Sequence, residues 1–167
     1  STPAQVRAET GMNALAHCVE ATWSPSRTPE AEAVALAGAA RIFAALPLVV
    51  DDPADLGARG EMFAGAVLGG RCLQNASMGV HHGLSQLVGG RTGIPHGLAN
   101  AIVLPAAIRF NADAVPGAIT RLEAALGVAD VAAAVSHLAV ELRLPTRLSD
   151  AGATEEDLEA IARLSQS

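Results

Sequence analysis

The sequence predicts a single all-helical domain, and three observations favour it. Half of the 167 residues are apolar but only 2% are aromatic, so the core has to be built from Ala, Val, Leu and Ile. Small side chains let helices approach closely, which favours dense helix-on-helix packing. Apolar residues recur at helical spacing along most of the chain, and no run alternates cleanly with the period of a strand. We therefore expect residues 1–167 to form one multi-helix bundle.

The first three helices are expected in the N-terminal half of the chain. Apolar residues at helical spacing predict a helix over Glu9–Thr22. The pair Thr28-Pro29 is typical of an N-cap and a first helical residue, and it predicts a second helix that reaches about Leu46. The polar residues 51–55 are expected to begin a third helix, which continues to about Asn75.

A glycine-rich stretch, Gly79–Gly97, follows these helices and holds the polar residues best suited to chemistry, which are His81, His82, Gln86 and His96. Beyond it, helical segments are expected near Leu98–Leu104, Pro105–Asn111, Val115–Leu126, Ala129–Leu142 and Thr154–Leu164. The last of these begins with a Thr N-cap and has glutamates in its first turn, where the helix dipole favours negative charge. No strand precedes a glycine loop, so we predict no phosphate-binding loop in this chain.

Charge and hydropathy exclude two classes of partner. The formal net charge is −6 and the Arg residues are scattered, whereas a nucleic-acid surface requires a basic patch. The longest apolar run, Val34–Val50, is interrupted by Arg41 and Pro47 and predicts a buried helix rather than a membrane span. The polar start of the chain lacks the apolar core of a signal peptide. Cys18 and Cys72 are expected to be buried thiols in a reducing compartment, which favours a cytoplasmic protein.

Two pairs of polar residues are the best candidates for a functional site. Asn13 and His17 are four positions apart on one predicted helix, so their side chains share a face, as paired metal ligands on helices do. His82 and His96 lie on either side of glycines that permit close backbone approach. His96 follows a proline at the apparent start of a helix, where the dipole favours the neutral imidazole that binds metals. Gln86, one turn beyond His82, is expected to face the same space.

The pattern alone leaves two interpretations open. Single histidines on helices are often satisfied core or surface residues, and His137 is interpreted in this way. Three or four histidines in two short motifs, with glycines between them, favour a functional cluster instead.

Three motifs resemble those of the iron-containing alcohol dehydrogenase and maleylacetate reductase family, in the family's order and spacing. They are Gly11–Ala21, which reads Gly-Met-Asn-Ala-Leu-Ala-His-Cys-Val-Glu-Ala, then Gly79–Leu84 and Pro95–Ala101, continued by Val103–Pro105 and Arg109–Asn111. The resemblance covers nearly the whole chain. It implies the helical C-terminal domain of a dehydroquinate-synthase-like enzyme, with the N-terminal α/β nucleotide-binding domain absent from this sequence.

The resemblance also implies a set of metal ligands. In the alcohol dehydrogenases of this family an Asp and three His hold divalent iron or zinc, and the matching positions here are Asn13, His17, His82 and His96. Asn13 stands where the family has its one anionic ligand. Hard divalent metals favour carboxylate oxygen, so metal binding is expected to weaken. Two alternatives stay open: a site that holds Fe²⁺ or Zn²⁺, and an enzyme that works without a metal. Three imidazoles still suffice for zinc with an open position.

The chain combines features of two branches of this family. Asn13 and the doublet His81-His82 are typical of maleylacetate reductases, the branch that we favour. Gln86 stands where that branch usually has a further His, and Pro95–Ala99 has the alcohol dehydrogenase form. An iron- or zinc-dependent alcohol dehydrogenase is therefore the alternative.

For a maleylacetate reductase, the resemblance implies hydride transfer from NADH or NADPH to a conjugated carbon–carbon double bond, which gives 3-oxoadipate in aromatic-compound degradation. The enolate formed needs hydrogen-bond donors and a closing proton, and His17, His81, His82 and His96 are the candidates for both roles. Arg91 is predicted to orient a substrate carboxylate through its bidentate fork, with a solvated loop residue as the alternative. In an alcohol dehydrogenase, a metal would instead polarise a carbonyl or activate an alcohol.

The resemblance places most of the nicotinamide site on the N-terminal domain. We therefore interpret the chain as a fragment of a two-domain enzyme, inactive alone and, by the same resemblance, a homodimer that acts on a small molecule. Its first residues align with the start of the family's helical half, and the end at Ser165–Ser167 is expected to stop short of where the family normally finishes its last helix. The alternative of a different class is a stand-alone helical protein with a ligand-binding or non-redox role.

Overall fold

The computed structural model describes residues 2–165, which fold into eight α-helices and no strand. In chain order the helices are α1 (Ala4–Ala21), α2 (Pro29–Asp51), α3 (Leu56–Asn75), α4 (Val80–Thr92), α5 (His96–Ala112), α6 (Pro116–Leu126), α7 (Val131–Glu141) and α8 (Glu155–Leu164). The all-helical prediction is confirmed. Residues 1, 166 and 167 of the predicted domain lie outside the described part of the chain.

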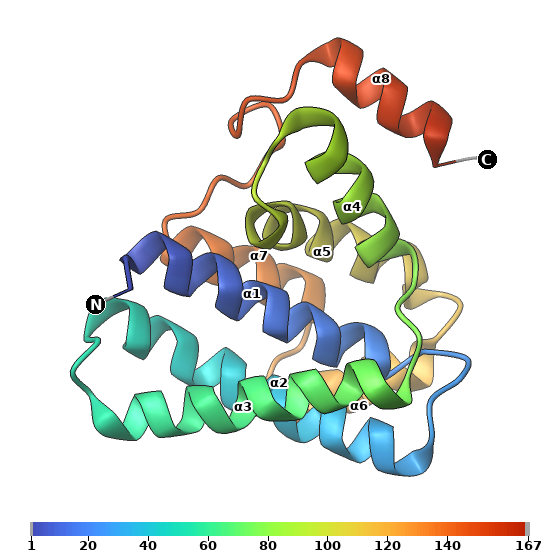
Figure 1. Ribbon diagram of the computed structural model, residues 1–167. Coiled ribbons are helices and arrows are strands. Elements are labelled where there is room, and N and C mark those ends of the chain that lie inside the picture. The colour runs from blue at the N-terminus through green and yellow to red at the C-terminus, as the bar shows by residue number, and fades with distance from the viewer. Residues whose placement is uncertain (1, 166–167) are drawn as a thin grey trace.

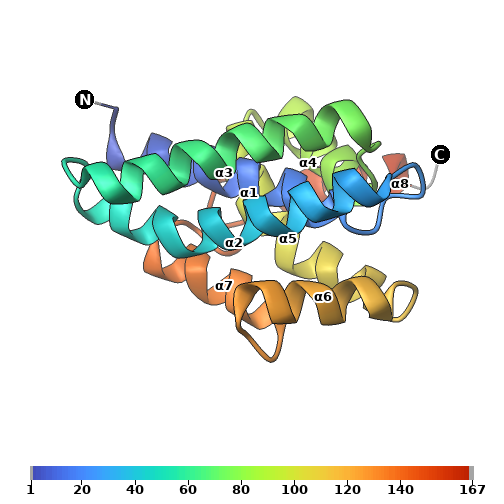
Figure 2. The ribbon, with the colours of Figure 1, turned by 90° about the horizontal axis from the view of Figure 1, so that it is seen from below.

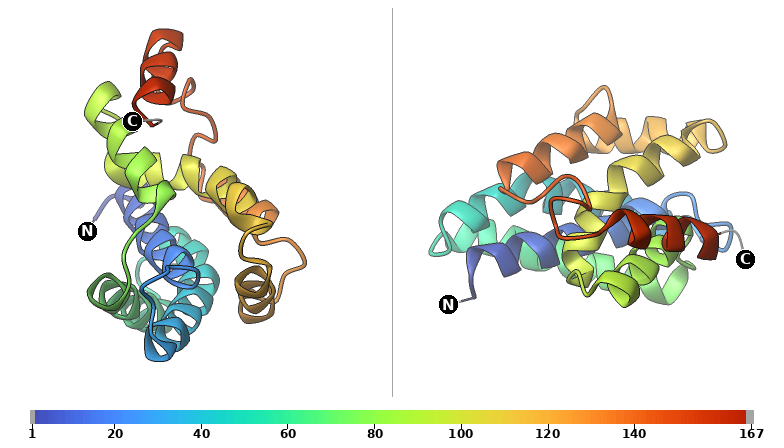
Figure 3. Two further views of the ribbon diagram at one scale, coloured as in Figure 1. Left: turned by 90° about the vertical axis from the view of Figure 1, so that its right-hand side faces the viewer. Right: turned by 90° about the horizontal axis from the view of Figure 1, so that it is seen from above.

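The central helix is α1, which packs against α2, α3 and α5 (Figure 1). The helices α6 and α7 lie together on the other side of α2 (Figure 2), where α6 contacts α2 and α7 contacts α5. On the opposite side α4 packs against α5, and α8 lies outermost against α4 (Figure 3). The core holds fully buried Met12, Ile42 and Leu104. Cys18 and Cys72 are free, buried thiols, as predicted.

Two helix ends differ from the sequence prediction. The helix α1 begins at Ala4 rather than Glu9, and α2 continues through Pro47 to Asp51 instead of ending near Leu46. A proline inside a helix removes one backbone hydrogen bond. Leu46 and Val49, on either side of Pro47, are both buried, so burial of the last turn of α2 outweighs that loss. The predicted N-cap is confirmed, since the Thr28 hydroxyl accepts from the backbone N–H of Ala31 at 3.1 Å.

The glycine-rich stretch and the segment after it are also more regular than expected. Residues Val80–Thr92 form α4, which ends at Gly93 in a left-handed conformation with φ 74°. The two expected segments on either side of Pro105 are one helix, α5. Pro105 is buried, as are its neighbours Leu104 and Ala107. Their packing keeps α5 continuous across a residue that disfavours a helix. Thr154 forms the predicted cap, with a full capping box to Asp157.

By length and composition, α2 is the one described helix that on its own meets the requirements of a membrane span, and α6 with α7 would count as a second, bent one. The buried side chains of α2 are those of a helix packed between neighbours, since α1, α3 and α6 all contact it. The expectation of a buried core helix at Val34–Val50 agrees with this packing.

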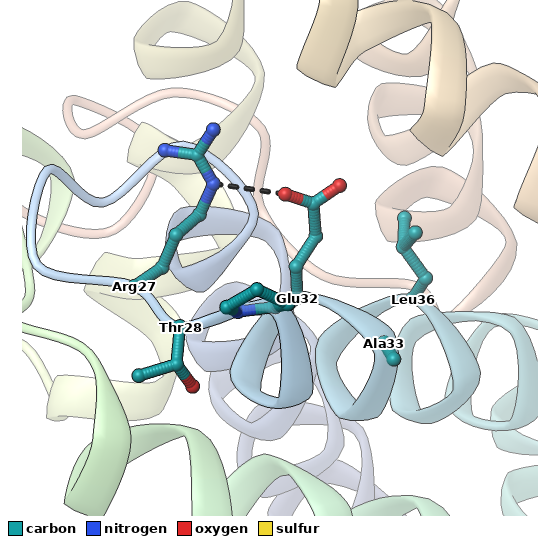
Figure 4. A pocket seen from close by; sticks show the side chains of 6 residues that line it. Arg27, Thr28, Glu32, Ala33 and Leu36 are labelled. Atoms are coloured by element: carbon teal, nitrogen blue, oxygen red, sulfur yellow. Dashed lines mark hydrogen bonds and ion pairs between the residues drawn. The ribbon is translucent and has the colours of Figure 1, made fainter.

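Glu32 joins the start of α2 to two other parts of the fold. Its carboxylate accepts from Arg27 Nε at 2.9 Å and also pairs with Arg121 of α6. The hollow beside it has a volume of about 470 Å³ and is lined by Arg27, Thr28 and Glu32 (Figure 4). No histidine lines this hollow, so it is separate from the candidate site. The hydrogen bond from Arg27 lowers the pKa of Glu32 below its ordinary value of 4.5.

Replacing Glu32 with Gln is expected to lower the free energy of unfolding by about 0.2–1 kcal/mol at pH 7, the usual range for surface ion pairs. Because the pKa of Glu32 is lowered in the folded state, its contribution is present above pH 4.5 and is lost as the pH falls through the lowered value. Urea unfolding of wild type and variant should therefore differ at pH 7 and agree at low pH. Glu123→Gln on the neighbouring helix is the control, and an equal loss there would contradict the specific role of Glu32.

Candidate active site

Three helices bring the predicted site residues together. Asn13 and His17 lie one turn apart on α1, His81 and His82 lie in the first turn of α4, and His96 is the first residue of α5. The ring of His82 stacks on that of His17, with centroids 4.3 Å apart, and its centroid lies 6.0 Å from that of His96. The ring of His81 meets that of His82 edge-on, with centroids 5.0 Å apart. The four histidines therefore form one cluster.

Asn100, in the second turn of α5, fixes the orientation of the Asn13 amide. Its Nδ2 donates to the carbonyl oxygen of His96 at 2.9 Å, and this carbonyl can only accept. The same nitrogen donates to Oδ1 of Asn13 at 2.7 Å. The other end of the Asn13 amide, Nδ2, lies 3.3 Å from Nε2 of His17. Asn13 thus presents an N–H donor to the His17 ring.

Glu20 lies beneath the cluster on α1 and is only 1% exposed. Its Oε2 lies 2.5 Å from Nδ1 of His82 and 3.6 Å from Nδ1 of His81. Burial alone would raise the pKa of Glu20, but the two histidines beside the carboxylate outweigh burial and hold the pKa at about 2. The carboxylate is therefore ionised at neutral pH, in a place where an unpaired charge would be costly.

His81 and His82 differ in what they can offer a substrate. His81 is fully buried, and its Nε2 donates to the carbonyl oxygen of Asn100 at 3.0 Å. Both ring edges of His81 therefore face protein. His82 uses only its Nδ1 edge, and its Nε2 is buried without a hydrogen-bond partner among residues 2–165. His82 is the member of the pair that has a ring atom free for a ligand.

The remaining two histidines are held neutral. Burial, followed by repulsion from His82 and His96, lowers the pKa of His17 to about 4. Partial burial, followed by repulsion from His82 and His81, lowers the pKa of His96. The direction of this shift agrees with the neutral His96 expected from its place at a helix start, and burial and the neighbouring histidines are its causes. Since Nε2 of His17 accepts from Asn13, its Nδ1 carries the proton, and that atom has no partner among residues 2–165.

The other candidates lie at the edge of this cluster or away from it. Gln86 is exposed on α4, one turn beyond His82. Arg91 is in the last turn of α4 rather than in a loop, and its Nε donates to Asp157 of α8 at 2.8 Å. Arg91 also forms an ion pair with Glu156 of α8. His137 is exposed on α7 and does not join the cluster.

The four residues matched to metal ligands do not fit a metal as they lie here. The N–H of Asn13 points at the Nε2 lone pair of His17, and turning the amide would break its bond to Asn100. Among the described residues, the group with ligand atoms all within 4.8 Å of one another is Glu20, His81 and His82. This group has the composition of a metal site, although its carboxylate already accepts N–H donors. We therefore derive no reaction step through a metal.

Known proteins resemble this chain in sequence and in structure. The family model described as the C-terminal part of the Fe-containing alcohol dehydrogenase family matches residues 7–166. The chain belongs to this family. The iron-containing alcohol dehydrogenase fold accounts for all eight helices, since the C-terminal domains of solved members superimpose on the whole chain.

Relatives within the family carry several enzyme names. The chain is 38% identical to maleylacetate reductase from Pseudomonas knackmussii over 97% of its own length and 46% of the relative's. It is 39% identical to 4-hydroxybutyrate dehydrogenase from Cupriavidus necator, over 92% of the chain and 43% of the relative. The structure of maleylacetate reductase from Agrobacterium tumefaciens gives a TM-score of 0.95 at 32% identity, covering 100% of this chain and 47% of that one. The chain therefore spans about half the length of the family members it matches.

Two residues of this site were not assigned a role from the sequence. Glu20 follows His17 by three positions, so helical spacing alone would have placed it on the same face of α1. Asn100 carries no such signal, because its partner Asn13 is on another helix and only the packing of α1 on α5 brings them together.

Proposed function

We propose that this chain is the helical half of an NAD(P)H-dependent maleylacetate reductase, which reduces maleylacetate to 3-oxoadipate. The observation that carries the proposal is the contact between Asn13 Nδ2 and His17 Nε2, which occupies the ring lone pair that a metal would need. The enolate formed when a double bond conjugated to a ketone is reduced can be stabilised by hydrogen-bond donors, so this reaction does not require a metal. The identity of 38% to a maleylacetate reductase supports the same choice.

The hydride in this reaction comes from a bound nicotinamide. Residues 2–165 contain no strand and hence no strand–glycine loop–helix unit to hold a dinucleotide. We therefore propose that the cofactor binds mainly on an N-terminal domain outside this chain, at a cleft that the histidine cluster faces. The NAD⁺ complex of a family member, sulfoacetaldehyde reductase from Bifidobacterium kashiwanohense at 30% identity, supports a nicotinamide cofactor. A homodimer remains an expectation of the family.

The histidines have distinct parts in the proposed reaction. Neutral His17 has a free Nδ1–H, and neutral His96 lies at the exposed edge, so both are suited to donate hydrogen bonds to the enolate oxygen. His82, with Glu20 behind its Nδ1, is suited to deliver the closing proton from Nε2, since the carboxylate stabilises the imidazolium that must form first. His81 is fully buried, so its proposed part is to support the other histidines rather than to contact the substrate.

Arg91 is the proposed partner for a substrate carboxylate, because maleylacetate is a dianion. Its side chain is 41% exposed and forms ion pairs with two acidic residues of α8. Binding a substrate carboxylate would exchange these surface ion pairs for a bidentate contact, and exposed pairs of this kind contribute little to stability.

Exhaustive chelation is expected to leave the activity of the full-length enzyme intact. We predict that oxidation of NADH or NADPH with maleylacetate continues unchanged after treatment with EDTA and removal of the metal–chelator complex, because Asn13 directs a donor rather than a lone pair at His17. Steady-state kinetics before and after treatment provide the measurement.

The matched variant is Asn13→Asp, which puts a carboxylate oxygen beside the His17 lone pair. An anionic oxygen is a better ligand for zinc than the amide, and it can hold a cation together with the His17 ring nitrogen, so we expect zinc affinity to rise at least tenfold over wild type. Loss of wild-type activity on chelation, with recovery on adding iron or zinc, would contradict metal independence and favour the alternative function.

That alternative is a metal-dependent alcohol dehydrogenase. The 39% identity to 4-hydroxybutyrate dehydrogenase favours it, as does the form of the motif Pro95–Ala99. Assays of the full-length enzyme with NAD⁺ and 4-hydroxybutyrate or simple alcohols separate the two functions.

A further inference from the structure

The start of α4 lacks a cap from its own sequence. Its N-cap residue is Gly79, which has no side chain to accept from the first backbone N–H groups. Such groups need a partner when they are buried. The partner is Glu20 of α1: its Oε1 accepts from the backbone N–H of Gly79 and of His81, both at 3.1 Å, and its Oε2 accepts from that of His82 at 3.3 Å. A carboxylate at this end also opposes the helix dipole favourably.

The same carboxylate fixes the proton of His82. Oε2 lies 2.5 Å from His82 Nδ1, and an ionised carboxylate can only accept, so Nδ1 carries the hydrogen. In the neutral ring the lone pair is then on Nε2, the buried atom without a partner among residues 2–165. One side chain therefore orders the first turn of α4 and determines which nitrogen of His82 faces the cluster.

We propose that Glu20 is the positioning residue of this site: it caps α4 and holds His82 in the Nδ1–H tautomer with Nε2 directed into the histidine cluster. The capping and the tautomer depend only on the contacts described above. The consequence for turnover rests on the proposed function, in which Nε2 of His82 delivers a proton.

Glutamine cannot replace Glu20 without loss. Two N–H donors converge on each carboxylate oxygen, whereas an amide has one oxygen and one donor nitrogen. If the amide nitrogen faces Gly79 and His81, the backbone N–H groups of these two residues face a donor instead of an acceptor, and α4 loses part of its cap. If it faces His82 instead, the ring can only accept at Nδ1, and the proton moves to Nε2.

The test uses the full-length enzyme with ¹⁵N-labelled histidine, at neutral pH. In wild type, the resonances of the neutral His82 ring are expected to show a protonated Nδ1 and an unprotonated Nε2. In Glu20→Gln we expect either the reversed pattern at His82 or a clearly lowered Tm, together with a 10–100-fold fall in kcat and a KM within about twofold of wild type. Glu9→Gln is the control, because Glu9 is also buried on α1, but its side chain bonds only to Gln5 among residues 2–165.

Each result decides a separate point. A wild-type spectrum with the proton on Nε2 of His82 would overturn the proposal even if the variant does not fold. An unchanged tautomer and Tm in Glu20→Gln would do the same, and a reversed tautomer with unchanged kcat would overturn the link to turnover. If the tautomer follows the prediction but wild type does not reduce maleylacetate, the proposed function fails and the positioning role stands.

Discussion

Replacing His82 with alanine is expected to lower kcat for NAD(P)H-dependent reduction by two to four orders of magnitude, the usual contribution of an acid–base group. The variant removes the one ring of the buried pair that has a nitrogen without a hydrogen-bond partner among residues 2–165. Its fold should persist, because the backbone N–H groups at the start of α4 still donate to Glu20. Steady-state kinetics of the full-length enzyme, with circular dichroism as a check on folding, provide the measurement.

The control for this prediction is His137→Ala, because His137 is exposed on α7 and lies outside the cluster. Its kinetics should match wild type. If His82→Ala keeps wild-type kcat in a folded protein, with maleylacetate and with alcohols alike, then the cluster is not the active site.

The sequence predicts the parts of this site that depend on local spacing. Asn13 and His17 share a helix face because they are four residues apart, and His96 begins a helix because a proline precedes it. The orientation of the Asn13 amide could not be predicted, because it depends on Asn100 of another helix. The amide orientation is the feature that argues against a metal, so the decisive detail of the site is a tertiary one.

The fold shows the same division between local and tertiary causes. Caps at Thr28 and Thr154 use residues next to their own helices and were correctly predicted. The continuity of α2 through Pro47 and of α5 through Pro105 was not predicted, since each proline disfavours a helix locally and burial of its neighbours reverses the balance. The glycine-rich stretch is helical for a related reason, because its cap comes from Glu20 on a different helix.

Gly97→Ala is expected to have the largest effect on stability, because α1 and α5 meet at this residue. A Cβ at Gly97 would lie 2.7 Å from the carbonyl oxygen of Glu9 and 2.8 Å from its carbonyl carbon. These are backbone atoms, so no change of rotamer relieves the contact, and the first turn of α5 must move away from α1. Overpacking of this kind costs about 1–3 kcal/mol or more, and we expect the Tm to fall by roughly 4–10 °C.

Movement of α5 would also carry His96 and Asn100 away from Asn13, so kcat should fall along with stability even where the variant is folded. The matched control is Gly90→Ala in α4, where a Cβ meets no atom within 4 Å. That change should stabilise by up to about 1 kcal/mol, since alanine is the better helix former. Calorimetry and kinetics of the two variants separate close packing from helix propensity. If Gly97→Ala is as stable and as active as Gly90→Ala, then α1 and α5 do not approach as closely as described, and the support for the orientation of Asn13 is lost with that contact.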